Sequence, residues 1–334
     1  MPMRGEAWDA LGHVYWKKRD VVQAKKCFEG SLEQNEENKV ALRNLSMVYR
    51  MLDKNPQSGE KIDAEEKKNN YKTSIELASK SVKLDMSDSQ SWYILGNAHL
   101  TNFFVNNEAT KELESALRAY SMSEKYMKEA NPDLFFNRAT IFEYLERYSE
   151  AVQNFQAAHQ IDPSLQGDKR ANAIVGFVSR AYNSIVNKGK IKSNRLTEMV
   201  KSIPQSIQGQ NTCKIVDLSQ LQNGENPGLM ISTKVVYNLE KPTDVPICFL
   251  LVDFKHNFCV MSIYNVSKQL SDKIRSGSEV LIRAPHLVLI QLQFKGYTYN
   301  YQCLKITDIR NILVNGAGLQ DDFASSEVIS KTFS

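Results

Sequence analysis

The sequence predicts a multidomain protein in which an α-solenoid precedes a small β-barrel. Up to about residue 187 the apolar residues recur at helical spacing, whereas from about residue 208 they gather in short β-rich runs separated by turns. The helical part also repeats a pattern of large and small residues with a period of about 34 residues. Such repeats stack into a solenoid because one helical pair cannot bury its own apolar face.

The clearest repeat lies at the start of the chain. Its signature residues are Trp8, Leu11, Gly12, Tyr15, Ala24 and Phe28. This order is typical of a tetratricopeptide repeat, in which bulky residues fill the space between two antiparallel helices and small residues allow close approach. We expect Gly12 and Ala24 to be the points of closest contact.

Three more units carry the same phases, and they are marked by Leu42 and Ser46, by Trp92 and Gly96, and by Ala139, Phe155 and Pro163. The four units are expected at about 5–38, 39–87, 88–131 and 132–165. The charged segment 53–72 is expected to be a solvated loop inside the second unit, and a shorter insertion is expected at 105–110.

The segment after Pro163 has an amphipathic pattern with Ile174, Phe177, Val178, Ala181 and Ile185 on one face. We expect a helix that caps the solenoid, so that the solenoid domain covers 1–187. A basic linker with a short helix is expected at 188–207. Its cluster of Lys188, Lys190, Lys192 and Arg195 is either a solvated helix end or a docking patch for an acidic partner.

Five or six β-rich runs then follow, with a short helical segment between the third and the fourth. This pattern predicts an OB-fold domain at 208–318, followed by a disordered tail at 319–334. Alternation places Tyr297, Tyr299 and Tyr301 on one face of a strand, where they either stack on nucleic-acid bases or pack in a core or interface. The nearly balanced charge of this domain favours packing, so we expect no direct nucleic-acid binding.

The composition is that of a globular protein, with 42% hydrophobic residues and a net charge of only +4. The five cysteines form no C-x-x-C pair and are expected to be reduced thiols. We expect no membrane span, and we expect the protein in the cytoplasm and the nucleus. No phosphate-binding glycine loop, hydrolase motif or cluster of metal ligands is present. The sequence therefore predicts a protein that is not an enzyme and has no cofactor or metal.

The repeat register predicts which side chains line the concave groove of the solenoid. These candidates are Arg43, Met47, Arg50, Tyr93, Asn97, Asp133 and Glu143. Both signs of charge are present, so a peptide with one basic and one acidic side chain would suit the groove, with Arg50 holding a carboxylate and Asp133 or Glu143 a guanidinium. The alternative for each residue is a solvated helix face.

Seven segments in order resemble the tetratricopeptide repeat protein 5 family, also called Strap. They are WDALGHVYWKKRDV, NLSMVYR, SWYILGN, NPDLFFNRAT, NKGKIK, LLVDFKHNFCVMSIYNV and VLIRAPHLVLIQLQFKGYTY. The resemblance implies tetratricopeptide repeats joined to a C-terminal OB fold. It also implies two functions. One is recognition of the N-terminal Met-Arg-Glu of nascent tubulin at the ribosome, which triggers decay of tubulin mRNA through a decay adaptor; the other is a nuclear stress-response cofactor that binds transcriptional coactivators.

The resemblance assigns roles to particular residues. Arg50 matches the family's peptide-gripping arginine and Asp133 its aspartate, so we expect Arg50 to bind the peptide's glutamate and Asp133 its arginine. A third acidic contact of the family falls at Gly167, next to Asp168. In the effector-docking stretch Lys192 is retained, but the family's following basic position is Asn194 here. We therefore expect docking through Lys190, Lys192 and Arg195. The family also has an acidic tail and helices before the unit of Trp8, so we expect an N-terminally truncated sequence.

Overall fold

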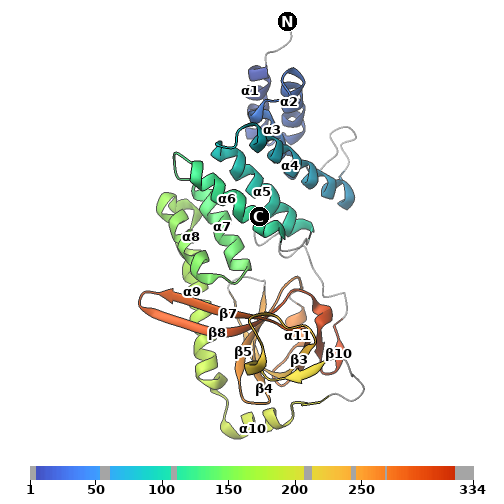
Figure 1. Cartoon of the computed structure of the whole chain (residues 1–334), viewed down its shortest axis with the longest axis vertical. Helices are drawn as coiled ribbons and strands as arrows, with labels where there is room; N and C mark the ends of the chain where they lie inside the picture. Colours follow the sequence, from blue (N-terminus) through green and yellow to red (C-terminus); the bar gives the residue numbers. More distant parts are fainter. Residues whose placement is uncertain are drawn as a thin grey trace. The chain divides into compact units, whose positions relative to one another are not determined.

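The computed structural model has helices followed by strands, as the sequence predicts (Figure 1). It describes residues 5–52, 61–106, 111–206, 213–241, 246–267 and 269–319. The chain divides into two compact units, Met1–Ile141 and Phe142–Ser334. In the described parts, no helix has both the length and the apolar character that a membrane span requires. The predicted tail lies outside the described residues except for Leu319.

The first unit consists of antiparallel helical pairs. Its helices are α1 (Gly5–Lys17), α2 (Val21–Gln34), α3 (Lys39–Met51), α4 (Ala64–Leu84), α5 (Ser89–Asn106), α6 (Lys111–Tyr126) and most of α7 (Pro132–Tyr144). Polar caps fix where several helices start, because a side-chain oxygen accepts from otherwise unpaired backbone N–H groups. Asp20 accepts from the N–H of Gln23, and Asn38 accepts from the N–H groups of Val40 and Ala41.

Glycines set the distance between paired helices, as the repeat pattern predicts. A Cβ built on Gly12 would lie 2.5 Å from the ring of Phe28, and one built on Gly96 would lie 2.5 Å from the ring of Tyr120. Phe28, Tyr120 and Ala24 are fully or almost fully buried. The hairpins α1–α2 and α5–α6 can therefore close tightly only because a large ring on one helix faces a residue without a side chain on the other.

The prediction of a solvated loop over 53–72 is wrong for the second half of that segment. Residues 53–60 lie outside the described residues, but α4 already begins at Ala64. The side chain of Asp63 accepts from the N–H of Glu66, and Tyr71 is buried against the repeat. A capping residue followed by acidic residues in the first turn favours a helix, so residues 64–72 are helical and not a loop.

The second unit begins with helices and ends with a barrel. Its helices are α8 (Tyr148–Ile161), α9 (Gly167–Val186), α10 (Ser193–Lys201) and α11 (Leu270–Lys273), with 3-10 turns at Pro163–Leu165, Lys188–Lys190, Leu218–Gln220 and Ile309–Asn311. Its main strands are β3 (Leu229–Leu239), β4 (Ile247–Asp253), β5 (Phe258–Ile263), β6 (Glu279–Arg283), β7 (His286–Phe294) and β8 (Tyr297–Ile306). The short strands are β1 (Lys214–Val216), β2 (Gly224–Glu225), β9 (Ile312–Val314) and β10 (Ala317–Gly318).

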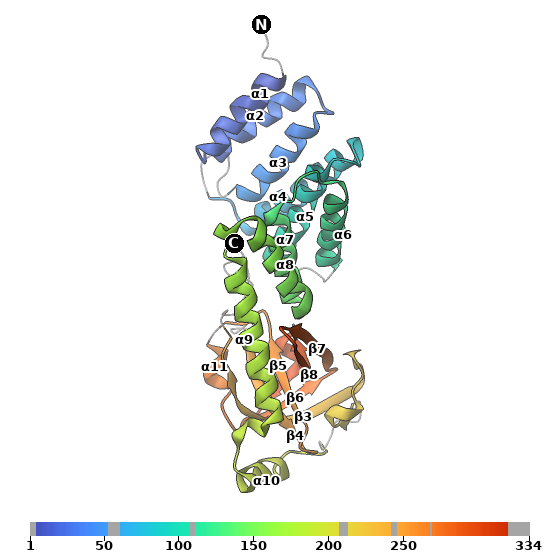
Figure 2. The ribbon, with the colours of Figure 1, turned by 90° about the vertical axis from the view of Figure 1, so that its left-hand side faces the viewer.

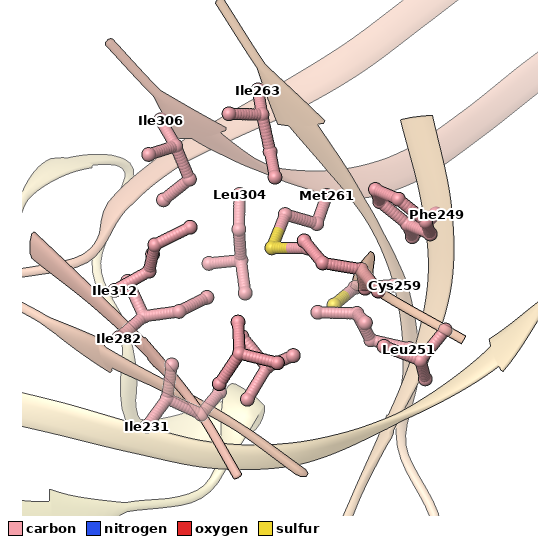
Figure 3. Packing of buried hydrophobic residues seen from close by; sticks show 14 of the residues in the cluster. Ile231, Phe249, Leu251, Cys259, Met261, Ile263, Ile282, Leu304, Ile306 and Ile312 are labelled. Carbon is pink, nitrogen blue, oxygen red and sulfur yellow. The ribbon is translucent and has the colours of Figure 1, made fainter. Parts of the chain in front are cut away.

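The strands close into the predicted OB barrel. In the strand order β6-β3-β4-β5-β8-β7, β6 pairs with β3 and β7 pairs with β8. The two end strands are joined through Ala284 and Pro285 alone, so the sheet returns to its start. The β5 and β8 strands are parallel, and the other pairs in this closed set are antiparallel. Inward-facing apolar side chains fill the barrel, among them Ile231, Phe249, Met261, Leu304 and Ile312 (Figure 3). This core holds the barrel together through burial of apolar surface.

The helix α9 packs against the outer surface of the barrel. It contacts β4, β5, β7 and β8 and runs alongside these strands (Figure 2). Its buried residues include Ile174, Phe177, Val178 and Ala181, the face that the sequence predicts. The sequence places the end of the solenoid domain at residue 187. In the structure α8 and α9 belong to the same compact unit as the barrel, because the apolar stripe of α9 needs a surface to cover it.

We expect Gly96→Ala to destabilise the first unit by about 1–3 kcal/mol, because the added methyl group overlaps the buried ring of Tyr120. Gly176→Ala is the matched control: its Cβ meets only the Nη1 atom of Arg180, at 3.4 Å, so the better helix propensity of alanine should leave stability unchanged or raise it. Urea unfolding followed by circular dichroism measures both variants. Equal effects of the two changes would contradict this packing argument.

Candidate peptide-binding groove

Arg50 lies in the last turn of α3 in an environment rich in tyrosine. Its Nη1 donates to the backbone oxygen of Ile94, at 3.2 Å. Burial lowers the pKa of its guanidinium to about 10, while Tyr120, Tyr93 and Tyr71 act in the opposite direction. No carboxylate pairs with Arg50 in the described part of the chain. The first unit thus holds a partly buried cation whose charge no described acidic residue neutralises.

Asn97 is held in a fixed orientation beside this arginine. Its Oδ1 accepts from the hydroxyl of Tyr120, at 2.7 Å, and from Nδ2 of Asn137, at 3.0 Å. Its Nδ2 group carries two hydrogens, and the Asn97 side chain also forms a hydrogen bond with Tyr93, which leaves one donor. Asn97 is partly exposed, so it can offer this donor to the backbone carbonyl of a bound chain.

Asp133 supplies the opposite charge, in the first turn of α7. Its backbone N–H donates to Oδ1 of Asn131, and its side chain is exposed. The positive end of the helix dipole favours a carboxylate at this position. Burial raises the pKa of Tyr93, a hydrogen bond with the Asn97 side chain lowers it, the nearby carboxylate of Asp133 raises it, and Arg50 lowers it. Tyr93 therefore lies within electrostatic reach of both charges. Arg50, Tyr93, Asn97 and Asp133 make up the candidate site that is here called the Arg50 groove, after the concave groove that the repeat register predicts.

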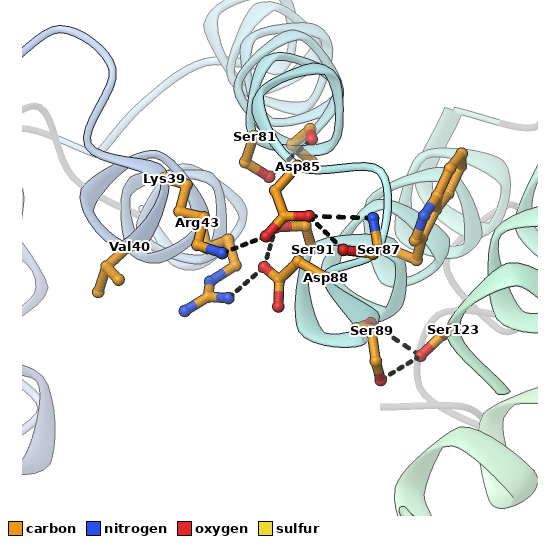
Figure 4. A network of polar contacts seen from close by, with 12 residues as sticks. Lys39, Val40, Arg43, Ser81, Asp85, Ser87, Asp88, Ser89, Ser91 and Ser123 are labelled. Atoms are coloured by element: carbon orange, nitrogen blue, oxygen red, sulfur yellow. Dashed lines mark hydrogen bonds and ion pairs between the residues drawn. The ribbon is translucent and has the colours of Figure 1, made fainter. Parts of the chain in front are cut away.

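Other predicted groove residues contribute to the fold. Arg43 forms an ion pair with Asp88 at 2.5 Å, and Ser91 donates to the same carboxylate (Figure 4). Lys39 pairs in the same way with Asp85. Met47 packs against the buried cluster that contains Ala78. Arg43 and Met47 stay predicted as peptide contacts, but the structure gives each of them an internal partner.

The two remaining acidic candidates, Glu143 and Asp168, lie in the second unit. Glu143 is 3% exposed, and its carboxylate pairs with Arg170 at 2.9 Å and with Lys241 at 3.8 Å. Asp168 lies in the first turn of α9 and accepts from Nδ2 of Asn172. Of these two, only Asp168 is partly accessible to a ligand, because Glu143 is buried and paired with Arg170 and Lys241.

A buried polar cluster that the sequence analysis missed joins the helices of the second unit to the barrel. Nζ of Lys305 donates to the backbone oxygen of Tyr144, at 2.7 Å, and it lies over the rings of Tyr144 and Tyr264. The hydroxyl of Tyr264 donates to Oε1 of Glu146 at 3.0 Å. The alternation of residues along β8 could have indicated this cluster, because it places Lys305 on the same face of the strand as Tyr301 and Cys303.

The three tyrosines of β8 do share a face, as the alternation predicts. Tyr301 is buried, Tyr299 contacts the ring of Tyr182 on α9 edge to face, and Tyr297 stacks on Tyr299. The face that strands 2 and 3 of an OB fold present to oligonucleotides corresponds to β4 and β5, and α9 packs there. This arrangement supports packing, and not base stacking, as the role of these rings.

The predicted docking stretch has an unusual backbone. Lys188, Gly189 and Lys190 all have positive φ, at 49°, 63° and 53°. A Cβ on Gly189 would lie 2.7 Å from Cγ1 of Val236, so this turn requires glycine. Lys188, Lys190, Lys192 and Arg195 are exposed, and none forms an ion pair with another described residue. Lys190 and Arg180 line a groove of about 580 Å³ between α9 and the end of β3.

The described residues contain neither a cluster of metal-binding side chains nor a disulfide. In the described residues, no group of three or more His, Cys, Asp or Glu side chains is placed to hold a metal ion. All five cysteines are free thiols. Burial raises the pKa of Cys248 to about 11, which keeps its thiol protonated and unreactive at neutral pH.

The fold and the groove define a class of protein in which tetratricopeptide repeats precede an OB barrel. Family comparisons agree: a tetratricopeptide repeat model matches residues 5–38, and the model of the tetratricopeptide repeat protein 5 OB fold domain matches residues 212–328. Tetratricopeptide repeat protein 5 of Homo sapiens is 36% identical over 328 residues, which cover 93% of this chain and 72% of that protein. The Mus musculus protein is 36% identical over 327 residues, with the same coverage. The chain belongs to the tetratricopeptide repeat protein 5 family.

Among solved structures, the crystal structure of MamA protein resembles the chain with a TM-score of 0.36 and 17% identity, covering 56% of this chain and 95% of that one. Proteins with such repeats are typically non-enzymatic scaffolds that bind peptides and partner proteins. Family and fold together make this chain a repeat-based adaptor for protein interactions.

We expect Glu143→Ala to destabilise the second unit by about 3–5 kcal/mol, because it leaves Lys241, whose side chain is 4% exposed, without its carboxylate. Glu150→Ala removes an exposed pair with Arg147 and should cost less than about 1 kcal/mol. Thermal unfolding monitored by calorimetry compares the two variants. A stability loss below about 1 kcal/mol for Glu143→Ala would contradict the structural role of these ion pairs. The carboxylate could then serve another role, such as peptide binding.

Proposed function

We propose that the chain is an adaptor whose Arg50 groove recognises a peptide that begins with Met-Arg-Glu, as nascent tubulin does. On this proposal it acts at ribosomes in the cytoplasm and links its peptide to an effector of mRNA decay. The observation that carries the proposal is the unneutralised charge of Arg50, partly buried beside the fixed amide of Asn97.

The charges of such a peptide complement the groove. Its glutamate would neutralise Arg50, and a guanidinium fork can hold a carboxylate by two parallel hydrogen bonds. Its arginine would pair with the exposed carboxylate of Asp133. The Nδ2 of Asn97 would donate to a backbone carbonyl of the peptide, so that its side chains stay in register with the two charges.

The first test is a double-mutant cycle with a fluorescent peptide that begins Met-Arg-Glu-Ile. We expect Arg50→Gln to weaken binding by about 1.5–3 kcal/mol, and we expect almost no further loss when the peptide glutamate is also changed to glutamine. Asp133→Asn should couple in the same way to the peptide arginine and not to the glutamate. Fluorescence anisotropy of the full chain gives all the affinities.

Arg118→Gln is the control, because this exposed arginine lies on α6 and pairs only with Glu114, four residues before it. It should leave the affinity unchanged. Independent effects of Arg50→Gln and of the peptide change, with no coupling, would show that the two groups do not meet. Absence of binding by the folded wild-type chain would refute the proposal.

A second prediction separates binding from stability at Arg50. Arg50 is a partly buried cation without an acidic partner among the described residues, and its burial has a desolvation cost. Methionine has a similar length and no charge, so Arg50→Met should raise the free energy of unfolding by about 1 kcal/mol or more. The same variant should lose peptide binding. Urea unfolding and anisotropy measure the two effects, and a clear loss of stability would instead indicate a structural role for this arginine.

The strained turn at Lys188–Lys190 supports a second surface for the same adaptor. Backbone in sparsely populated regions persists where the fold over-determines it, and such positions cluster at functional sites. Here the turn presents Lys190 at the rim of a groove, with Lys192 and Arg195 exposed nearby. We infer that an acidic segment of an effector, either a decay adaptor or a transcriptional coactivator, binds this cluster.

A further inference from the structure

A small cationic pocket lies where β6 bends into β7, and it is here called the barrel-end pocket. Its polar lining includes Glu225, Arg283, His286, Lys305, Thr307 and Asn311, and its volume is about 240 Å³. Pockets for drug-sized ligands usually measure about 300–1,000 Å³. The barrel-end pocket therefore suits a small ion or the end of a single side chain.

The sheet register fixes three of these charged groups in one row. His286 on β7 lies directly opposite Lys305 on β8 and directly opposite Glu225 on β2. Residues paired in this way project from the same face, with Cβ atoms about 5 Å apart. The imidazole of His286 thus lies between an ammonium group and a carboxylate.

A rigid bend presents the fourth charged group, Arg283, at the end of β6. The next residue, Ala284, has a φ of 44°, and its N–H donates to the backbone oxygen of Leu229 at 2.9 Å. The buried side chain of Asn226 donates to the backbone oxygen of Pro285 at 3.1 Å. These bonds hold the bend, so Arg283 does not depend on a flexible loop for its position.

Among the residues that line the pocket, cationic groups outnumber acidic ones. Arg283 is partly buried and forms no ion pair with another residue in the described ranges. Lys305 donates to Tyr144, lies over the rings of Tyr144 and Tyr264 and is attracted by the nearby carboxylate of Glu146, so Arg283 is the pocket cation that no described carboxylate pairs with. Glu225 is the single acidic residue among the lining residues, and its side chain is exposed. Burial and then Lys305 lower the pKa of His286, while Glu225 and Glu146 raise it.

We propose that the barrel-end pocket binds a phosphate-type oxyanion. The guanidinium fork of Arg283 would hold two of its oxygens, and His286 and Lys305 would donate to the others. The small volume admits one tetrahedral anion or the phosphate of a phosphorylated side chain. This site belongs to the barrel and is separate from the Arg50 groove and from the basic stretch around Lys190.

Titration calorimetry of the full chain with inorganic phosphate, at constant ionic strength with chloride, tests the proposal. We expect saturable binding that Arg283→Gln weakens about tenfold and Glu225→Gln strengthens by a few fold, because the first change removes an attractive charge and the second a repulsive one. Arg310→Gln is the control: this exposed arginine of the same domain pairs with Asp308, so its loss should not matter.

O-phosphoserine as a second probe distinguishes a free anion from a side-chain phosphate. Binding at least as tight as that of inorganic phosphate supports a phosphorylated chain as the ligand, and selective binding of inorganic phosphate supports the free ion. Equal heats for wild type, Arg283→Gln and Glu225→Gln would overturn the proposal. Because Glu225 is exposed, its variant tests the pocket even where Arg283→Gln impairs folding.

The pH dependence supplies an independent readout, with sulfate as a probe whose charge stays constant. A bound dianion favours protonated His286, whose pKa burial and Lys305 lower in the free pocket, so affinity should rise as the pH falls from neutral toward that lowered pKa. Glu225 and Lys305, which face the imidazole from the neighbouring strands, are the same in wild type and variant, so they cannot account for a difference between the two profiles. His286→Gln should abolish the rise, and an unchanged pH profile in this variant would contradict the role of His286.

Discussion

The close approach of paired helices at a residue without a side chain is the constraint on which the first unit depends. The ring of Tyr120 occupies the space that a side chain at Gly96 would take. The same ring ends in the hydroxyl that fixes the amide of Asn97. Packing inside the repeat and the orientation of a groove residue are therefore two effects of one contact. A change that moves the helices apart would also release the donor that faces the groove.

The difference between paired and unpaired charges separates the structural residues from the candidate binding residues. Arg43, Lys39 and Glu143 have partners of opposite sign within the chain, and these pairs tie neighbouring helices together. Arg50 has no such partner among the described residues. Burial lowers the pKa of its guanidinium, which shows that the charged form is disfavoured there. A cation in such surroundings lowers stability unless a ligand of opposite charge pairs with it. A charge that has no partner within the described fold is thus a better guide to binding than the position of a residue in the repeat.

Much of the fold could be predicted from the sequence because periodic patterns reflect burial. The glycine positions, the strand Tyr297–Ile306 and the apolar face of α9 all follow from spacing. What α9 packs against could not be predicted in this way, because an apolar stripe does not specify its partner. The roles of Arg43 and Glu143 were equally hidden: their partners, Asp88 and Arg170, lie far along the chain, and only the tertiary structure brings them together.

The packing of α9 on the barrel has a consequence for how the chain can be divided. The sequence suggests that the β-rich part is a module that could be cut out, reused or exchanged by itself. Without α9, however, such a module would expose the outer face of β8, including Tyr301 and Cys303, which are buried in the whole unit. Hydrophobic strand faces of this kind promote aggregation. The smallest unit that could be transferred between proteins therefore includes α9 together with the barrel. Recombination at residue 187 would separate two halves of one core.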